Sequence, residues 1–198
     1  MGYDRMERDH EMTHEETERH LFECLDNICT YLSAGAHWNM RAANASRRLA
    51  IRGFGRWHDC CAKYNFCELD RLEKIVGDKL GRSPRIDMQM VSKAEAFDMG
   101  NMSEFKSHLK MWMDMHGELS DHLNRAIHSS KKIDMQIYEK LCCLVNKVQD
   151  EKMRIRMAHD SFEFAGWNPH DISVKSMIIH KYFEEKHVEG EDVNFNLG

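Results

Sequence analysis

Three residues that can bind a metal occur where a helical pattern turns side chains toward the interior. Glu68, His116 and Glu151 are polar exceptions within rows of apolar residues spaced three or four apart. A carboxylate in such a row costs several kcal/mol unless it is paired or bound to a metal. Two carboxylates and an imidazole can bind Fe(II), Mn(II) or Zn(II). A hydrogen-bonded Glu–His contact without a metal is the alternative interpretation.

Seven cysteines are the other candidates for chemistry. The pattern Cys60-Cys61-x5-Cys67 does not match the C-x2-C spacing that is typical of zinc sites. An odd number of cysteines without a secretory pattern indicates reduced thiols rather than a disulfide framework. We therefore interpret them as small buried residues and surface thiols, with a redox or metal role as the alternative. The remaining four are Cys24, Cys29, Cys142 and Cys143.

Four long segments with helical periodicity must position these residues. Gly81 and Pro84 match the signals that end a helix, and Ser103 and Asp134 match those that begin one. Residues 81–102 form a long connection, which predicts that the second and third helices run parallel. The sequence thus predicts an all-α chain, an up-down four-helix bundle with one long crossover and a short fifth helix. The expected helices span 14–40, 45–80, 103–130, 134–164 and 172–187, with a turn at 166–171.

Composition limits the partners of this bundle. The net charge of −5 and the pI near 6.2 argue against nucleic acid or an anionic membrane as the main partner. The first 20 residues are charged throughout, and the sequence has no run of 18 apolar residues, so we expect a cytoplasmic protein. The expected organisation is a charged N-terminal extension (1–13), the helical domain (14–190) and an acidic tail (191–198).

Four motifs occur in the order in which the ferritin family carries similar ones. They are RHLFECLDNICTYLS (19–33), AIRGFGRW (50–57), LGRSPRI (80–86) and HKYFEEKHVEG (180–190). The chain therefore resembles ferritins over residues 14–190. This resemblance implies a subunit of a 24-subunit cage that stores iron, assembled from identical copies or together with other ferritin subunits. It also implies a di-iron ferroxidase centre inside the bundle of each active subunit.

Carried over to this sequence, the family's iron ligands are mostly replaced. Tyr31 matches the first-helix Tyr, but Cys24 occupies the position of the first-helix Glu. On the second helix Tyr64-Asn65 replaces the Glu-Glu pair, and Glu68 occupies the position of the His. A shift of three residues would instead place Arg71 at that His position, and this register stays open. On the third helix His116 replaces a Glu, and on the fourth Val148, or Gln149 after a shift of one, replaces a Gln.

The substituted centre favours an iron-storage subunit that lacks efficient ferroxidase activity. Its candidate metal ligands are Glu68, His116, Glu151 and Tyr31, with Cys24, Asn65 and Gln149 as weaker ones, and iron is the expected ion. A remodelled, active ferroxidase is one alternative. A structural or chaperone-like protein of the ferritin fold is another, because lysines in the segment 131–143 would weaken cation steering where ferritins have acidic pores.

Overall fold

The computed structural model of the chain describes residues 12–188, with side chains up to Lys181. Within these residues the secondary structure is entirely helical, which confirms the prediction of an all-α chain. The predicted acidic tail (191–198) and most of the predicted N-terminal extension (1–13) lie outside the described residues. The helices are α1 (His14–Arg48), α2 (Arg52–Leu80), α3 (Met88–Glu95), η1 (Met102–Glu104), α4 (Phe105–Ile133), α5 (Met135–Phe164) and α6 (Pro169–Val188).

Local capping explains where the long helices begin and end. Thr13 and Glu16 form a capping box at the start of α1, each side chain accepting from the backbone N–H of the other. Asp134 caps α5 by accepting from the backbone N–H of Gln136 and Ile137. Gly81 ends α2 in the left-handed conformation, with φ at 70°. The sequence signals at Gly81 and Asp134 therefore correspond to real helix ends.

The predicted break between the first two helices is wrong by about two turns. The sequence predicts a first helix that ends at residue 40 and a second that begins at residue 45, whereas α1 continues to Arg48 and α2 begins at Arg52. The segment contains good helix formers, and Ala42, Ala43 and Ala45 are completely buried, so packing favours continuation of the helix. The chain instead turns at residues 49–51, where Ala50 has a positive φ of 60°.

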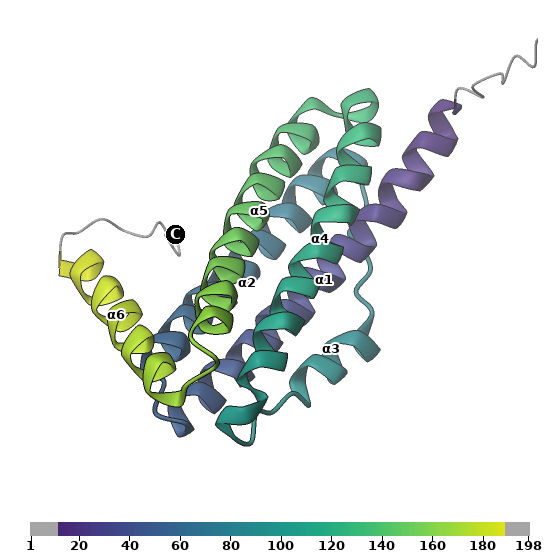
Figure 1. Cartoon of the computed structure of the whole chain (residues 1–198). Helices are drawn as coiled ribbons and strands as arrows, with labels where there is room; N and C mark the ends of the chain where they lie inside the picture. Colours follow the sequence, from purple (N-terminus) through teal and green to yellow (C-terminus); the bar gives the residue numbers. More distant parts are fainter. Residues whose placement is uncertain (1–11, 189–198) are drawn as a thin grey trace, which may run out of the picture.

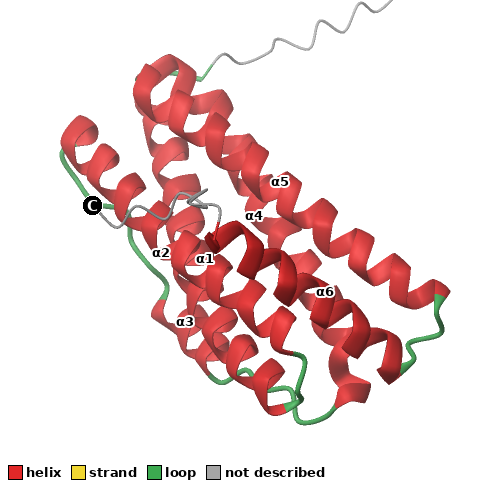
Figure 2. Ribbon diagram, turned by 90° about the vertical axis from the view of Figure 1, so that its left-hand side faces the viewer, coloured by secondary structure: helices red, strands yellow, loops and turns green. Residues whose placement is uncertain are grey.

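The four long helices lie side by side as two antiparallel pairs (Figures 1 and 2). Helix α1 packs against α2 and α4, α5 packs against α4, and α2 and α5 make only sparse contact. The connection from α2 to α4 returns along the length of the molecule, so that these two helices run parallel, as predicted. The predicted long connection contains a short helix, α3, which packs against α1 and buries Val91 and Ala94.

Two clusters of buried side chains hold the long helices together. One is aliphatic and includes Leu25, Ile28 and Leu72. The other is aromatic and surrounds Trp38 and Trp112.

Within the described residues, no helix is both long and apolar enough to span a membrane.

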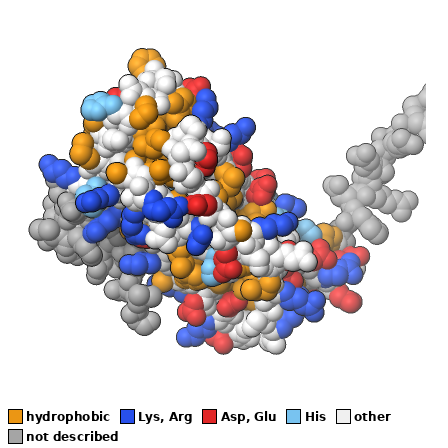
Figure 3. All heavy atoms as spheres, turned by 90° about the horizontal axis from the view of Figure 1, so that it is seen from below, with side chains coloured by type: hydrophobic (Ala, Val, Ile, Leu, Met, Phe, Trp, Pro, Cys, Tyr) orange, Lys and Arg blue, Asp and Glu red, His pale blue; other side chains and the backbone are white. Residues whose placement is uncertain are grey.

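Helix α6 lies against α2 at the end of the molecule where α2 begins (Figure 1). Viewed from that end, the surface shows hydrophobic side chains among charges of both signs (Figure 3). The two helices approach closely at Gly53, whose backbone N–H donates to the Ser176 hydroxyl over 2.9 Å. A Cβ atom on Gly53 would lie 1.8 Å from the Ser176 carbonyl oxygen. Only glycine therefore permits this contact.

Replacing Gly53 should separate α6 from α2. We expect Gly53→Ala to raise amide hydrogen exchange in α6 at least tenfold, because a backbone clash cannot be relieved by a change of rotamer. Gly77→Ala is the matched control within α2, since its Cβ would come no closer than 4.0 Å to the Ser83 hydroxyl. That variant should keep the exchange rates of α6 and stabilise the chain by about 1 kcal/mol. Unchanged exchange in Gly53→Ala would contradict the close contact.

Candidate functional site

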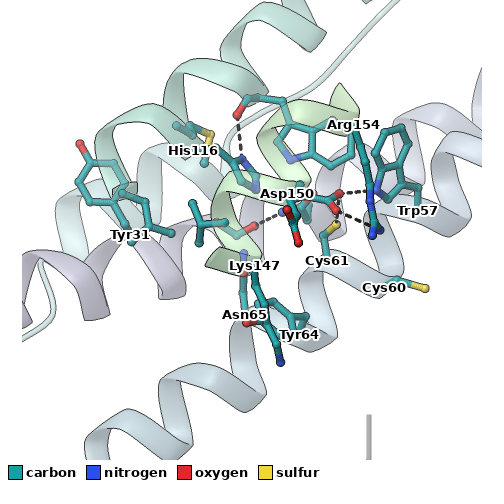
Figure 4. Close-up of a pocket in the computed structure, with 17 residues that line it drawn as sticks. Tyr31, Trp57, Cys60, Cys61, Tyr64, Asn65, His116, Lys147, Asp150 and Arg154 are labelled. Carbon is teal, nitrogen blue, oxygen red and sulfur yellow. Dashed lines mark hydrogen bonds and ion pairs between the residues drawn. The ribbon is translucent and has the colours of Figure 1, made fainter. Parts of the chain in front are cut away.

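A cavity of about 330 Å³ lies between the four long helices (Figure 4). It opens on the side where α2 and α5 make sparse contact, because the exposed side chains that line it, Lys147, Asp150 and Arg154, all come from α5. Every long helix contributes to the lining. The lining also includes Tyr31, Trp57, Cys61, Tyr64, Asn65, Trp112, His116, Leu119, Val148 and Glu151.

Glu151 is the carboxylate that hydrogen bonds fix in this cavity. One of its oxygens, Oε1, accepts from the Trp57 indole N–H and from the Cys61 thiol, the latter over 3.2 Å. The other oxygen, Oε2, lies 3.9 Å from the Arg154 guanidinium. Burial, followed by the charge of Glu151, raises the pKa of the Cys61 thiol well above its usual value. Cys61 is therefore a neutral donor at physiological pH rather than a reactive thiolate.

His116 presents a neutral imidazole to the same cavity. Its Nδ1 lies 3.0 Å from the Trp112 carbonyl oxygen, which can only accept, so Nδ1 carries the proton. Burial lowers the pKa of His116, and the uncharged ring leaves Nε2 as an acceptor. Figure 4 shows the ring directed into the cavity. The interior thus offers two acceptors, the Glu151 carboxylate and the His116 ring.

Two cations at the opening balance two carboxylates. Lys147 and Arg154 are exposed on α5, and Asp150 and Glu151 lie between them in the sequence. The Lys147 ammonium lies 5.2 Å from the centre of the Tyr64 ring, within the range of a cation–π contact. The charges that line the cavity therefore sum to zero.

The structure brings together only some of the predicted site residues. Tyr31, Asn65, His116 and Glu151 line the cavity. The Tyr31 hydroxyl donates to the Glu118 carboxylate, and burial together with that bond raises the pKa of Tyr31 to about 12. Two of the weaker candidates lie elsewhere. Cys24 is buried with its sulfur 4.0 Å from the His20 ring, and Gln149 is exposed.

Glu68 is also outside the cavity, so the predicted set of Glu68, His116 and Glu151 is not assembled. Its buried carboxylate pairs with Arg71 over 3.1 Å and with the Lys140 ammonium. Glu151 accepts a hydrogen bond from Cys61, whereas Glu68 follows Cys61 by seven residues, or about 10 Å along α2. This axial distance keeps Glu68 out of the cavity. Arg71 belongs to the same ion pair, so neither register of α2 provides a ligand at this level. Among residues 12–181, no group of three or more His, Cys, Asp or Glu side chains could hold a metal ion.

A buried histidine pair was not predicted. The Nε2 atoms of His58, on α2, and His108, on α4, lie 2.9 Å apart, and His58 Nδ1 lies 2.7 Å from the Asn39 side-chain oxygen. The Asn39 amide nitrogen donates to the Gly35 carbonyl oxygen, so its oxygen must accept the proton of His58 Nδ1. His58 Nε2 is then an acceptor, and His108 Nε2–H donates to it. The pair could have been suspected from the position of His108, which lies one turn before Trp112 on the inward face of the helix.

This hydrogen-bonded chain ends at an unpartnered atom. His108 Nδ1 is buried and makes no hydrogen bond within the described residues. The Trp38 ring stacks on His108 with centroids 4.9 Å apart, and Trp112 contacts His58. Burial lowers the pKa of His108 to about 3 and lowers that of His58 well below its usual value. Both rings are therefore neutral at physiological pH.

All seven cysteines are free thiols, in agreement with the interpretation from their spacing. Cys24 and Cys29 are buried, and Cys143 is exposed.

Comparison of the chain with protein-family models and with curated protein sequences gives no match to either.

Proposed function

We propose that the chain is a ferritin-like four-helix-bundle subunit of an iron-storage shell, with a bundle centre that does not oxidise iron efficiently. One observation carries the proposal. Four positions that the resemblance assigns to the ferritin iron centre, one on each long helix, line a single cavity. They are Tyr31, Asn65, His116 and Val148. Cys24 and Glu68, which the same resemblance assigns to the centre, lie outside this cavity, so the agreement with the ferritin centre is partial.

The order and direction of the helices also support a ferritin-like bundle. Helix α1 is antiparallel to α2, a long connection leads to a parallel α4, and α5 returns beside α4 before the terminal α6. One long crossover within a four-helix bundle is the ferritin-like arrangement.

The side chains in the cavity support the expected lack of oxidase activity. A di-iron centre requires bridging carboxylates. At the corresponding positions this chain has the Asn65 amide, the neutral His116 ring and the aliphatic Val148. The Glu151 carboxylate is held by Trp57 and Cys61, and Lys147 and Arg154 place positive charge at the opening. Because Asp150 and Glu151 balance these cations, the lining does not attract Fe(II) electrostatically.

A structural or chaperone-like role is the second candidate, favoured by the lysines of segment 131–143. The remodelled ferroxidase depended on the set of Glu68, His116 and Glu151, and it is less favoured because Glu68 does not line the cavity that contains the other two. Iron storage is favoured over the structural role because residues from all four iron-centre helices still meet in one cavity.

Iron oxidation and retention test the proposal. In Fe(II) solution under air, the purified protein should oxidise iron no more than about twofold faster than buffer, because the carboxylates that bridge two iron ions are replaced. Co-assembled with an active ferritin subunit, it should retain iron as mineral. The readouts are absorbance of Fe(III) and iron bound per assembly. Rapid oxidation that Glu151→Gln abolishes would contradict the lack of ferroxidase activity, and mixed assemblies without iron would contradict storage.

A further inference from the structure

The cavity between the four long helices has the features of a small-molecule site. Its volume of about 330 Å³ lies within the range of ligand pockets, which are mostly apolar with a few convergent polar groups. Four aromatic side chains line it, namely Tyr31, Trp57, Tyr64 and Trp112. Leu119 and Val148 add aliphatic surface. Such walls favour a flat, unsaturated ligand, because aromatic rings pack well in offset and edge-to-face contacts.

The polar groups inside the cavity indicate what such a ligand must donate. Glu151 Oε1 already accepts from Trp57 and Cys61, whereas Oε2 has Arg154 at 3.9 Å, which is beyond hydrogen-bond distance. His116 Nε2 is an acceptor, because Nδ1 carries the proton of the neutral ring. Two acceptors at the same level call for a ligand with N–H donors. The donors would compensate the desolvation of both acceptors when the ligand displaces solvent.

The net charge of the lining indicates an uncharged ligand. Lys147 and Arg154 oppose Asp150 and Glu151, so neither an anion nor a cation gains from the overall charge. A purely apolar ligand would leave the acceptors of Glu151 and His116 unpaired in the interior.

We propose that this cavity binds a planar, uncharged nitrogen heterocycle whose ring N–H donates to Glu151 Oε2 or to His116 Nε2. The heterocycle packs against the aromatic walls and enters between α2 and α5. This site requires neither iron storage nor shell assembly, so it stands or fails independently of the proposed function.

Benzimidazole and 1-methylbenzimidazole form the matched pair of probes, because they share the fused rings and the acceptor nitrogen, and a methyl group replaces the N–H donor. Quenching of tryptophan fluorescence reports binding, since Trp57 and Trp112 line the cavity. For benzimidazole we expect saturable binding with a dissociation constant of about 0.1 to 1 mM, the range for so few ligand atoms. The affinity of 1-methylbenzimidazole should be about tenfold weaker, because it cannot satisfy the buried acceptors.

Variants locate the site. Glu151→Gln and His116→Phe should each weaken benzimidazole binding, and Leu119→Trp should abolish it by filling the cavity. Glu163→Gln is the matched control, because Glu163 is also on α5 and also accepts from a tryptophan, Trp167, but does not line the cavity. Thermal melts select the variants that fold. No saturable binding, equal affinity for the two probes, or affinities that the folded cavity variants leave unchanged would each overturn the proposal.

Discussion

The stability of the chain should fall by about 3 kcal/mol between pH 6.5 and pH 4 through His108 alone. Burial lowers the pKa of His108 to about 3 in the folded state, against a usual value of 6.5. The unfolded chain therefore binds more protons than the folded chain below pH 6.5. The stability is fully present above that pH and is lost progressively as the pH falls toward 3. His58, with its pKa shifted in the same direction, adds to the loss.

Urea unfolding at intervals from pH 7.5 to pH 4 measures this loss. The double variant His58→Phe/His108→Leu removes both rings together, so that neither ring remains without its partner, and it should show a flatter dependence on pH. His170→Gln, at an exposed residue of α6, is the control and should follow the wild-type curve. Acidic residues titrate in all three proteins, so the difference between the curves isolates the buried pair. Parallel curves for the wild type and the double variant would show that the pair does not control the acid response.

Lys140→Met should destabilise the folded chain by about 2 to 4 kcal/mol. The Glu68 carboxylate is only 2% exposed and pairs with the Lys140 ammonium from α5 and with Arg71 one turn away on α2. Removing Lys140 leaves a buried charge whose remaining partner is 45% exposed and so is partly screened by solvent. Arg71 keeps the loss below that of a buried carboxylate with no partner at all.

A double-mutant cycle separates the ion pair from the packing of the side chains. Glu68→Leu/Lys140→Met should be more stable than Lys140→Met alone, because an apolar pair leaves no buried charge. Lys74→Met, at an exposed lysine of α2, should change the free energy of unfolding by less than about 0.5 kcal/mol. A Lys140→Met variant as stable as the Lys74→Met control would mean that water or Arg71 satisfies Glu68 without Lys140.

Helical spacing and end signals made much of the fold predictable. Asp134 and Gly81 are strong local signals, because a side-chain cap and a left-handed glycine satisfy backbone groups directly. The end of α1 had no such signal. The alanines after Met40 fit both a loop and a helix in sequence, and only their burial against neighbouring helices decides for the helix. Helix α3 was missed for the same reason, since Val91 and Ala94 become its buried face only beside α1.

The sequence predicted which residues face the interior of the bundle, but not which side chains pair with one another. The apolar rows correctly turned Asn65, His116 and Glu151 toward the interior. They could not predict the ion pair between Glu68 and Lys140, because that pairing depends on the axial alignment of α2 with α5. Likewise, His108 is next to Leu109 in sequence, and only the packing of the helices brings its ring to His58.

The mass of the native assembly, measured together with its iron content, tests the proposed function most directly. A ferritin-like shell of 24 copies of the 23.4 kDa chain should sediment at roughly 560 kDa, or at a similar mass when mixed with other ferritin subunits, and should contain iron. An iron-free monomer or dimer, unable to join a shell of active ferritin subunits, would contradict the account.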